Sequence, residues 1–595
     1  MIPDLSQLEA ALRLPHTAPL QPDLQKFALS SAPSYVRQQA ELLKQKGAEY
    51  LQSETPVLSY SLFTQFWQTG ERKNYENLYF NRRGRLLTFA LLSWLYPTQA
   101  CYIDALTEII WSICSEPFWC LPAHFLDAQG ADLPFEAYET QLDLFACETG
   151  CGLAEALHIA GNLLPKTVVQ QAKAQIHKRC IAPFLNTAVT YRFEQMTNNW
   201  SGVCGGALGM VGLYCIEEPA LLAVYLKRCM ASCQVYLNSF GADGVCTEGV
   251  DYWSYGFGFF TCFAQMLASR TQNGFNYFAL PKVQAIAASQ QYFYFSQDNT
   301  LSFADGSEHS NYRCGLSHFL QGALGAPCPP ASLAANVLQD HCYRFCLALR
   351  DFLWVSADIA ALPPVTPQPV YLPQAEWFLA RTGSLSLAAK AGHNGESHNH
   401  NDCGSFILHK NGQAVFCDYG SGLYDAAYFS EKRYEIFVTG SVSHNVPILN
   451  GQFQQAGGCY HTKVLATNLD QNPNVFLLDA TSCYPQNTAL AFTRKFEVDI
   501  EKNRICLYDD ILFAQAGSVT EVFCGAEEIE LACAGVAVFC RNGEKVHLHY
   551  DAQQFTASVV THDFTDNTQT LRHAWQLHLT LKQDVHHYTA NFIFN

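Results

Sequence analysis

The sequence has few charged residues. Only 15% of its 595 residues are Asp, Glu, Lys or Arg, and it contains no long run of like charge and no repetitive tract. Because 49% of the residues are hydrophobic, we expect large buried cores, little disorder and two or more domains. The formal net charge is −17, which disfavours a nucleic-acid partner because nucleic-acid-binding surfaces are basic.

Targeting signals are also missing. The N-terminus MIPDLSQLEAALRLPHTAPL has no basic segment followed by an apolar core, and no apolar run reaches membrane-spanning length. The 24 cysteines are scattered, without CxxC pairs at zinc-finger spacing. We therefore expect a cytoplasmic protein with mostly free, buried thiols and no membrane partner. The oligomeric state stays open.

The chain divides into two parts with different hydrophobic periods. From about residue 35 to 360, apolar residues recur at helical spacing, as in RRGRLLTFALLSWLYP. The stretch LPPVTPQPVYLP is a candidate linker, and alternating strand-like segments follow it. These patterns predict a helical array or toroid over residues 1–365 and an antiparallel β-sandwich over residues 366–595.

A cluster of metal-binding residue types lies near the start of the predicted sandwich. The segment GESHNHNDCGSF carries His398, His400 and Asp402, and Asp418 and His444 follow. On a strand, residues two apart point to the same face, so His398 and His400 suit a divalent metal together with a nearby carboxylate. Taken alone, the cluster favours a metal-dependent hydrolase, and zinc is the first choice of metal.

Two motifs in the helical part are less specific. NNW ends at Trp200 and begins at Asn198, which fits polar side chains at a cleft as well as a helix N-cap before a core tryptophan. EGVDYWSYG begins at Glu248 and contains Tyr252, Trp253 and Tyr255. These aromatic rings suit a core, and they also suit a platform on which sugar rings stack.

Together, the motifs resemble the heparinase II/III superfamily of polysaccharide lyases. The matching pieces are NNW, EGVDYWSYG, HNHNDCGSF, DYGSG, KRY and SVSHN, in the same order, over about residues 190 to 455. The resemblance implies an (α/α) toroid followed by an antiparallel β-sandwich. Asn198 at the first motif position places the chain nearer the heparinase III-like branch.

The resemblance also implies a reaction and a set of residues. The reaction is β-elimination of a uronic-acid-containing oligo- or polysaccharide, such as a glycosaminoglycan fragment, which leaves a 4,5-unsaturated uronate. By motif position, Asn198 would neutralise the uronate carboxylate, while Tyr252 and His398 would be catalytic. The implied ligands of a structural divalent metal are His400, Asp418 and His444.

Further residues are candidates for substrate contact, and each has an ordinary structural alternative. Stacking or core packing suits the aromatic side chains, and an arginine fork suits a carboxylate or a surface salt bridge. A polar loop, FADGSEHSNYR, is a further candidate for the border of the cleft. The substrate-binding candidates are Trp253, Tyr255, Glu248, Arg433 and Tyr428.

The chemistry of elimination fits these residue types. The C5 proton is weakly acidic, so hydrogen bonds that stabilise the developing dianion are essential, and a neutral Asn amide donates one. A tyrosine can act as base and acid when its pKa is lowered, and a histidine can share that work. A zinc-dependent hydrolase and a glycan-binding protein that has lost catalysis are the two alternatives.

Overall fold

The computed structural model describes residues 2–296, 299–362 and 368–595. The chain forms two compact units. Unit 1 is Met1–Phe240, Tyr252–Ala288 and Asn311–Pro364, and unit 2 is Gly241–Asp251, Ser289–Ser310 and Val365–Asn595. The expected boundary between residues 365 and 366 lies outside the described residues. Two segments that precede that boundary therefore pack with unit 2.

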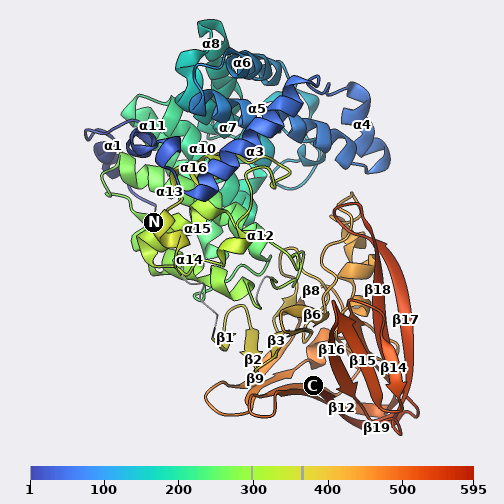
Figure 1. Cartoon of the computed structure of the whole chain (residues 1–595). Coiled ribbons are helices and arrows are strands. Elements are labelled where there is room, and N and C mark those ends of the chain that lie inside the picture. Colours follow the sequence, from blue (N-terminus) through green and yellow to red (C-terminus); the bar gives the residue numbers. More distant parts are fainter. Residues whose placement is uncertain (1, 297–298, 363–367) are drawn as a thin grey trace. The chain divides into compact units, whose positions relative to one another are not determined.

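Unit 1 is helical, and its long helices α5, α7, α10, α11, α13 and α16 pack on one another (Figure 1). The helix bounds are α1 Leu5–Leu12, α2 Gln21–Lys26, α3 Ser34–Leu51, α4 Tyr60–Thr69, α5 Lys73–Leu95, α6 Ala100–Cys114, α7 Leu144–Ala160, α8 Lys166–Ile176, α9 Ala182–Leu185, α10 Asn199–Cys215, α11 Pro219–Asn238, α12 Val250–Tyr252, α13 Gly258–Arg270, α14 Pro281–Phe293, α15 Cys314–Leu324, α16 Phe345–Leu353 and α17 Ala357–Ala360. The helices α12 and α14 each end in one unit and begin in the other.

Helix α10 is unusually rich in glycine for a buried helix, with the sequence NWSGVCGGALGMVGLYC. A Cβ atom on Gly206 would lie 2.7 Å from the backbone oxygen of Phe259, and one on Gly209 would overlap the ring of Phe263. The glycines therefore let α13 approach α10 closely, which offsets their poor helix propensity. This packing fixes the N-terminus of α10, where Asn198 stands.

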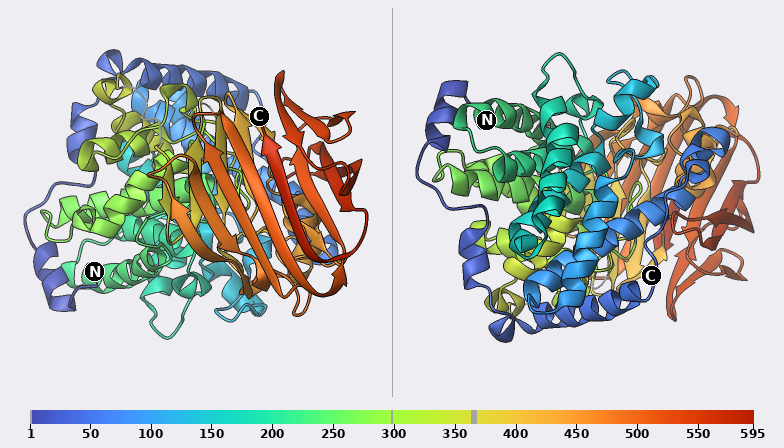
Figure 2. Two further views of the ribbon diagram at one scale, coloured as in Figure 1. Left: turned by 90° about the horizontal axis from the view of Figure 1, so that it is seen from below. Right: turned by 90° about the horizontal axis from the view of Figure 1, so that it is seen from above.

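Unit 2 is built from antiparallel strands, shown in yellow to red (Figures 1 and 2). Its described residues form a nine-stranded sheet, in the order β1-β2-β3-β5-β6-β13-β18-β17 with β7 paired to β13, and an eight-stranded sheet, β14-β15-β16-β19-β12-β11-β10-β9. The strand bounds are β1 Val370–Leu372, β2 Trp377–Arg381, β3 Leu385–Lys390, β4 His393–Asn394, β5 Phe406–Lys410, β6 Gln413–Phe416, β7 Ile448–Leu449, β8 Gly457–His461, β9 Lys463–Asn468, β10 Asn474–Asp479, β11 Ala491–Asp499, β12 Arg504–Gly517, β13 Val519–Gly525, β14 Glu530–Cys533, β15 Val536–Arg541, β16 Glu544–His549, β17 Phe555–Thr565, β18 Leu571–Leu581 and β19 Val585–Phe594.

The two sheets of unit 2 enclose one hydrophobic core, as in a β-sandwich. Phe406 of β5 contacts Phe496 of β11 with ring centroids 5.6 Å apart, and Phe416 of β6 stacks on Phe539 of β15 at 4.0 Å. Strands such as β10 alternate buried and half-buried residues along their length, which puts one face on this core. The expected toroid-then-sandwich order is confirmed.

All 24 cysteines lie in the described residues, and all are free thiols, most of them buried. Within the described parts of the chain, no helix combines the length and the apolar character needed to cross a membrane.

Candidate functional site

Three of the predicted metal ligands come together in unit 2. One ligand atom from each of His400, Asp418 and His444 lies within 4.8 Å of the others, and all three residues are buried. Nδ1 of His444 is 3.2 Å from Oδ2 of Asp418, and Nδ1 of His400 is 3.8 Å from Oδ1 of the same carboxylate. The ligand set that the resemblance implied therefore forms one compact cluster. The expectation of a strand-borne histidine pair was wrong, because His398 and His400 lie in a loop between β4 and β5 and His398 is not part of the cluster.

Hydrogen bonds from buried side chains to backbone groups hold the loops that carry these ligands. The side chain of Asn445, next to His444, donates to Phe406 O at 2.7 Å and accepts from Cys524 N at 2.7 Å, so it ties its loop to β5 and β13. The buried guanidinium of Arg494 donates to Asn445 O at 2.7 Å and to Gly404 O at 3.1 Å. These bonds explain the Asn of the SVSHN motif as a residue that shapes the loop.

The cluster has the character of a cation site. Nδ1 of His400, Oδ2 of Asp418 and both ring nitrogens of His444 are buried without a hydrogen-bond partner among the described residues. Burial alone raises the pKa of Asp418, but the charge of His444 outweighs it, so the pKa is lowered. Two imidazoles and a carboxylate with unused, converging atoms fit a divalent metal, and zinc takes such a donor set. By contrast, Asp402 is paired with Lys390 at 2.8 Å.

A residue that the sequence did not single out lies at the centre of the site. The side chain of Asp305 is fully buried, and the residue comes from the polar loop between α14 and α15. Its carboxylate accepts hydrogen bonds from two histidine rings, two tyrosine hydroxyls and one guanidinium, all within unit 2; the donors are His398, His400, Tyr424, Tyr428 and Arg433. Asp305 belongs to the polar loop FADGSEHSNYR, which the sequence marked as a candidate without indicating this residue.

His398 lies between two carboxylates. Its Nδ1 is 2.7 Å from Asp305 Oδ2, and its Nε2 is 3.6 Å from Glu248 Oε2. Burial lowers the pKa of His398, but the hydrogen bond and charge of Asp305 outweigh burial and the pKa is raised. His398 also has φ of 56°, a left-handed conformation that is rare for a residue with a side chain and frequent at functional sites.

Three glycines let the loops that carry Glu248, Asp305 and Asp418 approach one another closely. Gly249 follows Glu248, Gly306 follows Asp305, and Gly420 lies two residues after Asp418. A Cβ on Gly249 would be 3.3 Å from Gly306 Cα, and one on Gly420 would be 3.0 Å from Gly306 O. Gly249 and Gly420 have φ of +101° and +69°, so both the conformation and the space favour glycine.

Two residues that were predicted to contact the substrate instead donate hydrogen bonds to other residues of the protein. Arg433 donates to Asp305 at 2.9 Å and, through Nε, to Asn399 O at 3.2 Å. Tyr428 is fully buried and donates to Asp305 at 2.5 Å, and the guanidinium of Arg433 lies 4.3 Å from its ring centroid. Both side chains therefore hold the carboxylate of Asp305, a role that the motif pattern did not indicate.

In unit 1, Asn198 is the N-cap of α10. Its Oδ1 accepts from Trp200 N at 3.1 Å, the capping geometry expected of Asn. The cap uses only the carbonyl oxygen, so the amide NH₂ of this half-buried residue keeps its function as a donor. Capping and substrate binding are therefore compatible at this position.

The remaining aromatic candidates of unit 1 differ in exposure. Tyr252 is half-buried and precedes a π-helical segment, Trp253–Phe257, a feature frequent at functional sites. Trp253 is fully buried and donates to Ile286 O at 2.8 Å, which is a core position. Tyr255 is buried, and its hydroxyl donates to Glu148. Of the three rings, Tyr252 has the most open position.

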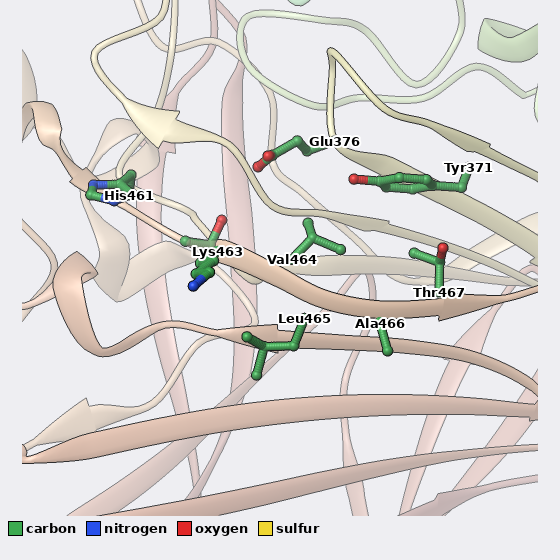
Figure 3. Close-up of a pocket in the computed structure, with 9 residues that line it drawn as sticks. Tyr371, Glu376, His461, Lys463, Val464, Leu465, Ala466 and Thr467 are labelled. Atoms are coloured by element: carbon green, nitrogen blue, oxygen red, sulfur yellow. The ribbon is translucent and has the colours of Figure 1, made fainter.

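A groove of about 550 Å³ lies elsewhere in unit 2, between Tyr371 and Glu376 on one side and strand β9 on the other (Figure 3). Strands β1 and β9 are edge strands of the two sheets, which leaves this side of the sandwich open. None of the predicted site residues lines it.

Comparison with known proteins places this arrangement in a wider context. Residues 364–589 match the family model "Heparinase II/III-like, C-terminal". The resemblance drawn from the motifs is thus confirmed over this part of the chain. A search of curated proteins gives no match.

Several solved lyases share the fold. A crystal structure of heparinase III is 13% identical, covers 97% of this chain and 93% of its own, and has a TM-score of 0.59. A heparan sulfate lyase from Pedobacter heparinus is 14% identical over 99% and 87%, with a TM-score of 0.54. A chondroitin AC lyase from Streptomyces coelicolor, in complex with chondroitin sulphate, is 10% identical over 99% and 82%, with a TM-score of 0.51. At such low sequence identities, the structural similarity establishes the fold alone.

Proposed function

We propose that this chain is a polysaccharide lyase that cleaves uronic-acid-containing glycans by β-elimination and leaves a 4,5-unsaturated uronate. The observation that carries the proposal is His398, held by a buried carboxylate beside a His-Asp-His cluster in a domain that matches a Heparinase II/III-like model. The names of the similar structures, which include heparan sulfate and chondroitin lyases, favour glycosaminoglycan fragments as substrates.

Asn198 would stabilise the charge that develops during elimination. Removal of the C5 proton places a second negative charge next to the uronate carboxylate, so a donor aimed at that carboxylate gains strength in the transition state. The NH₂ group of Asn198 is such a donor, and the N-cap bond to Trp200 N fixes its side chain. An amide also donates without carrying a proton that it could lose.

Tyr252 and His398 would move the protons. A tyrosine that takes the C5 proton can return it to the O4 leaving group when both lie on one side of the sugar ring. His398 would assist through Nε2, because Nδ1 is engaged by Asp305 at 2.7 Å. Glu248, at 3.6 Å from Nε2, would orient the ring or accept a proton from it.

The metal would be zinc in a structural role, held by His400, Asp418 and His444. A bound ion would supply positive charge that fixes these three side chains. The side chains are 0%, 3% and 1% exposed, respectively, so a glycan has little access to the ion. The burial supports a structural ion over a zinc-dependent hydrolase, which needs an open coordination position for water and substrate.

We also propose a cytoplasmic location. The free state of all 24 cysteines supports it, because reducing compartments keep thiols unpaired. An enzyme there would act on short imported oligosaccharides. Thiol titration of the native protein under denaturing conditions, without reductant, should find most cysteines free.

The catalytic assignment is tested by Tyr252→Phe and Asn198→Ala. Tyr252→Phe keeps the ring, so KM should change little while kcat falls by about 10²–10⁴-fold, as expected for lost acid–base catalysis. Asn198→Ala should also lower kcat, and both variants should keep their metal. The control is Tyr255→Phe, whose hydroxyl contacts Glu148. Wild-type turnover by Tyr252→Phe would exclude Tyr252, and a large loss only in Tyr255→Phe would move the role there.

A further inference from the structure

We propose that Asp305 is a positioning residue that fixes the protonation pattern and orientation of His398 and, through its other oxygen, the orientation of the metal-ligand candidate His400. The inference rests on the proposed function for its effect on turnover. Its structural claims concern ring nitrogens and metal affinity, which can be measured without any substrate.

The two oxygens of the carboxylate have separate partners. Oδ2 accepts from Nδ1 of His398 at 2.7 Å and from the hydroxyl of Tyr424 at 3.0 Å. Oδ1 accepts from Nε2 of His400 at 3.1 Å, from Tyr428 at 2.5 Å and from Nη2 of Arg433 at 2.9 Å. One side chain thus bridges the catalytic candidate and the metal cluster.

These bonds dictate where the ring protons lie. Two tyrosine hydroxyls and the guanidinium of Arg433 donate to the carboxylate of Asp305, which therefore acts as a hydrogen-bond acceptor at both oxygens. Nδ1 of His398 and Nε2 of His400, which contact the same oxygens, are then the donors and carry protons. Nδ1 of His400 is then left with its lone pair on the side of Asp418, as a metal ligand requires.

The surroundings of Asp305 indicate a role beyond charge balance. Arg433 alone would neutralise the buried carboxylate, yet four further donors converge on it. The preceding residue, Ala304, has φ of 58°, and His398 has φ of 56°. The left-handed conformation is unfavourable for residues with a side chain, and here it occurs at His398 and directly before Asp305. The hydrogen bonds to Asp305 maintain it at both places.

Asp305→Asn separates this role from simple packing. The amide oxygen should stay with the three donors at Oδ1, because one of them is a guanidinium. The NH₂ group would then face Nδ1 of His398 and force its proton onto Nε2. In a serine protease catalytic triad, a tautomer exchange of this kind lowers kcat by about 10⁴-fold.

The experiment uses the full-length protein with ¹⁵N-labelled histidine, and His398→Gln identifies the signals of that ring. In the wild type, Nδ1 of His398 should be protonated; in Asp305→Asn, Nδ1 should become an acceptor. The kcat of Asp305→Asn should fall at least about 100-fold while KM stays within about threefold. Asp402→Asn is the matched control, since Asp402 is equally buried but paired with Lys390; it should leave the His398 tautomer unchanged.

The proposed effect of Asp305 on His400 is tested separately, by the affinity for zinc. Asp305→Ala should weaken zinc binding by about 10–100-fold in competition with a chromophoric chelator, the usual effect of removing a carboxylate behind a histidine ligand. An unprotonated Nδ1 of His398 in the wild type would overturn the proposal even if no variant folds. An unchanged tautomer in Asp305→Asn, or unchanged zinc affinity in Asp305→Ala, would overturn the corresponding half. If the wild type forms no unsaturated product, the proposed function fails while these two measurements still decide the role of Asp305.

Discussion

Two buried aspartates in unit 2 have opposite surroundings. The side chain of Asp305 is 0% exposed and accepts five hydrogen bonds from protein donors. The side chain of Asp418 is 3% exposed, and its Oδ2 has no hydrogen-bond partner among the described residues, like both ring nitrogens of the neighbouring His444. Protein donors satisfy the carboxylate of Asp305, whereas Asp418 lies in a cluster whose unused atoms fit a cation.

The difference separates the surroundings of two histidines that the motif HNHND places side by side. His398 contacts Asp305, and under the proposed function this bond orients its ring. His400 contacts both carboxylates, with Nε2 toward Asp305 and Nδ1 toward Asp418. Alternate residues of one loop thus contact Asp305 and the metal-ligand candidates, and His400 contacts both.

The largest effect should follow from breaking the Asp418 side. His444→Ala removes a metal ligand, so we expect loss of stoichiometric zinc and of the stability that bound metal confers, about 4 kcal/mol when free zinc exceeds its Kd a thousandfold. Elemental analysis and thermal unfolding with and without a chelator measure both effects. The control is His461→Ala, at an exposed position of β8. If the wild type bound no metal and its unfolding did not respond to a chelator, Asp418 would not differ from Asp305 in lying at a cation site.

The carboxylate of Glu148 in unit 1 is a third case to compare with Asp305 and Asp418. Burial raises the pKa of Glu148 to about 7, and Arg344 and Tyr255 only partly offset it. The folded protein therefore holds a proton on Glu148 between about pH 4.5 and 7 that the unfolded chain releases. Its contribution to stability is present below pH 4.5 and is lost as the pH rises through about 7.

Glu148→Gln removes this dependence. Its stability relative to wild type should rise from pH 5 to pH 8 by at most about 3 kcal/mol, since each pKa unit corresponds to about 1.4 kcal/mol. Urea unfolding of both proteins at several pH values measures the difference. A difference that does not vary with pH would show that the hydrogen bond from Tyr255 and the charge of Arg344 keep Glu148 ionised, as the donors keep Asp305.

The smallest effect should come from removing one donor of Asp305. Tyr428→Phe deletes a single hydrogen bond to a carboxylate that keeps four others, so we expect a loss of about 1.5–3 kcal/mol in stability and unchanged zinc content. Tyr424→Phe, at the other oxygen, is the matched variant. If Tyr428→Phe released the metal, the two aspartates would form one cooperative network.

Much of this arrangement could be predicted from the sequence. Periodicity predicted the order of helical and strand regions, and the motif positions predicted that His400, Asp418 and His444 lie together, because loops and short strands within one region of the chain carry them. The aromatic motif is compatible with the burial of Trp253, and NNW is compatible with the N-cap at Asn198.

The hydrogen-bond centre of the site could not be predicted in this way. Asp305 precedes the proline-rich stretch by more than fifty residues and belongs to a segment of unit 2, Ser289–Ser310, that begins within α14. Nothing local distinguishes its Asp-Gly pair from a turn. The inward direction of Arg433 and Tyr428 also depends on this long-range contact, so pattern alone suggested that they face the substrate.

The central claim is that the chain cleaves glycans by elimination, and the mass of the products tests it most directly. Heparan sulfate, hyaluronan, chondroitin, alginate and glucuronan oligosaccharides of defined length would be incubated with the wild type and with Tyr252→Phe. Elimination predicts fragments whose masses add up to that of the substrate, together with new ultraviolet absorbance, and a strong loss of both in Tyr252→Phe. Fragments that together gain the mass of one water per cleavage, without ultraviolet absorbance, would contradict the account and identify a hydrolase.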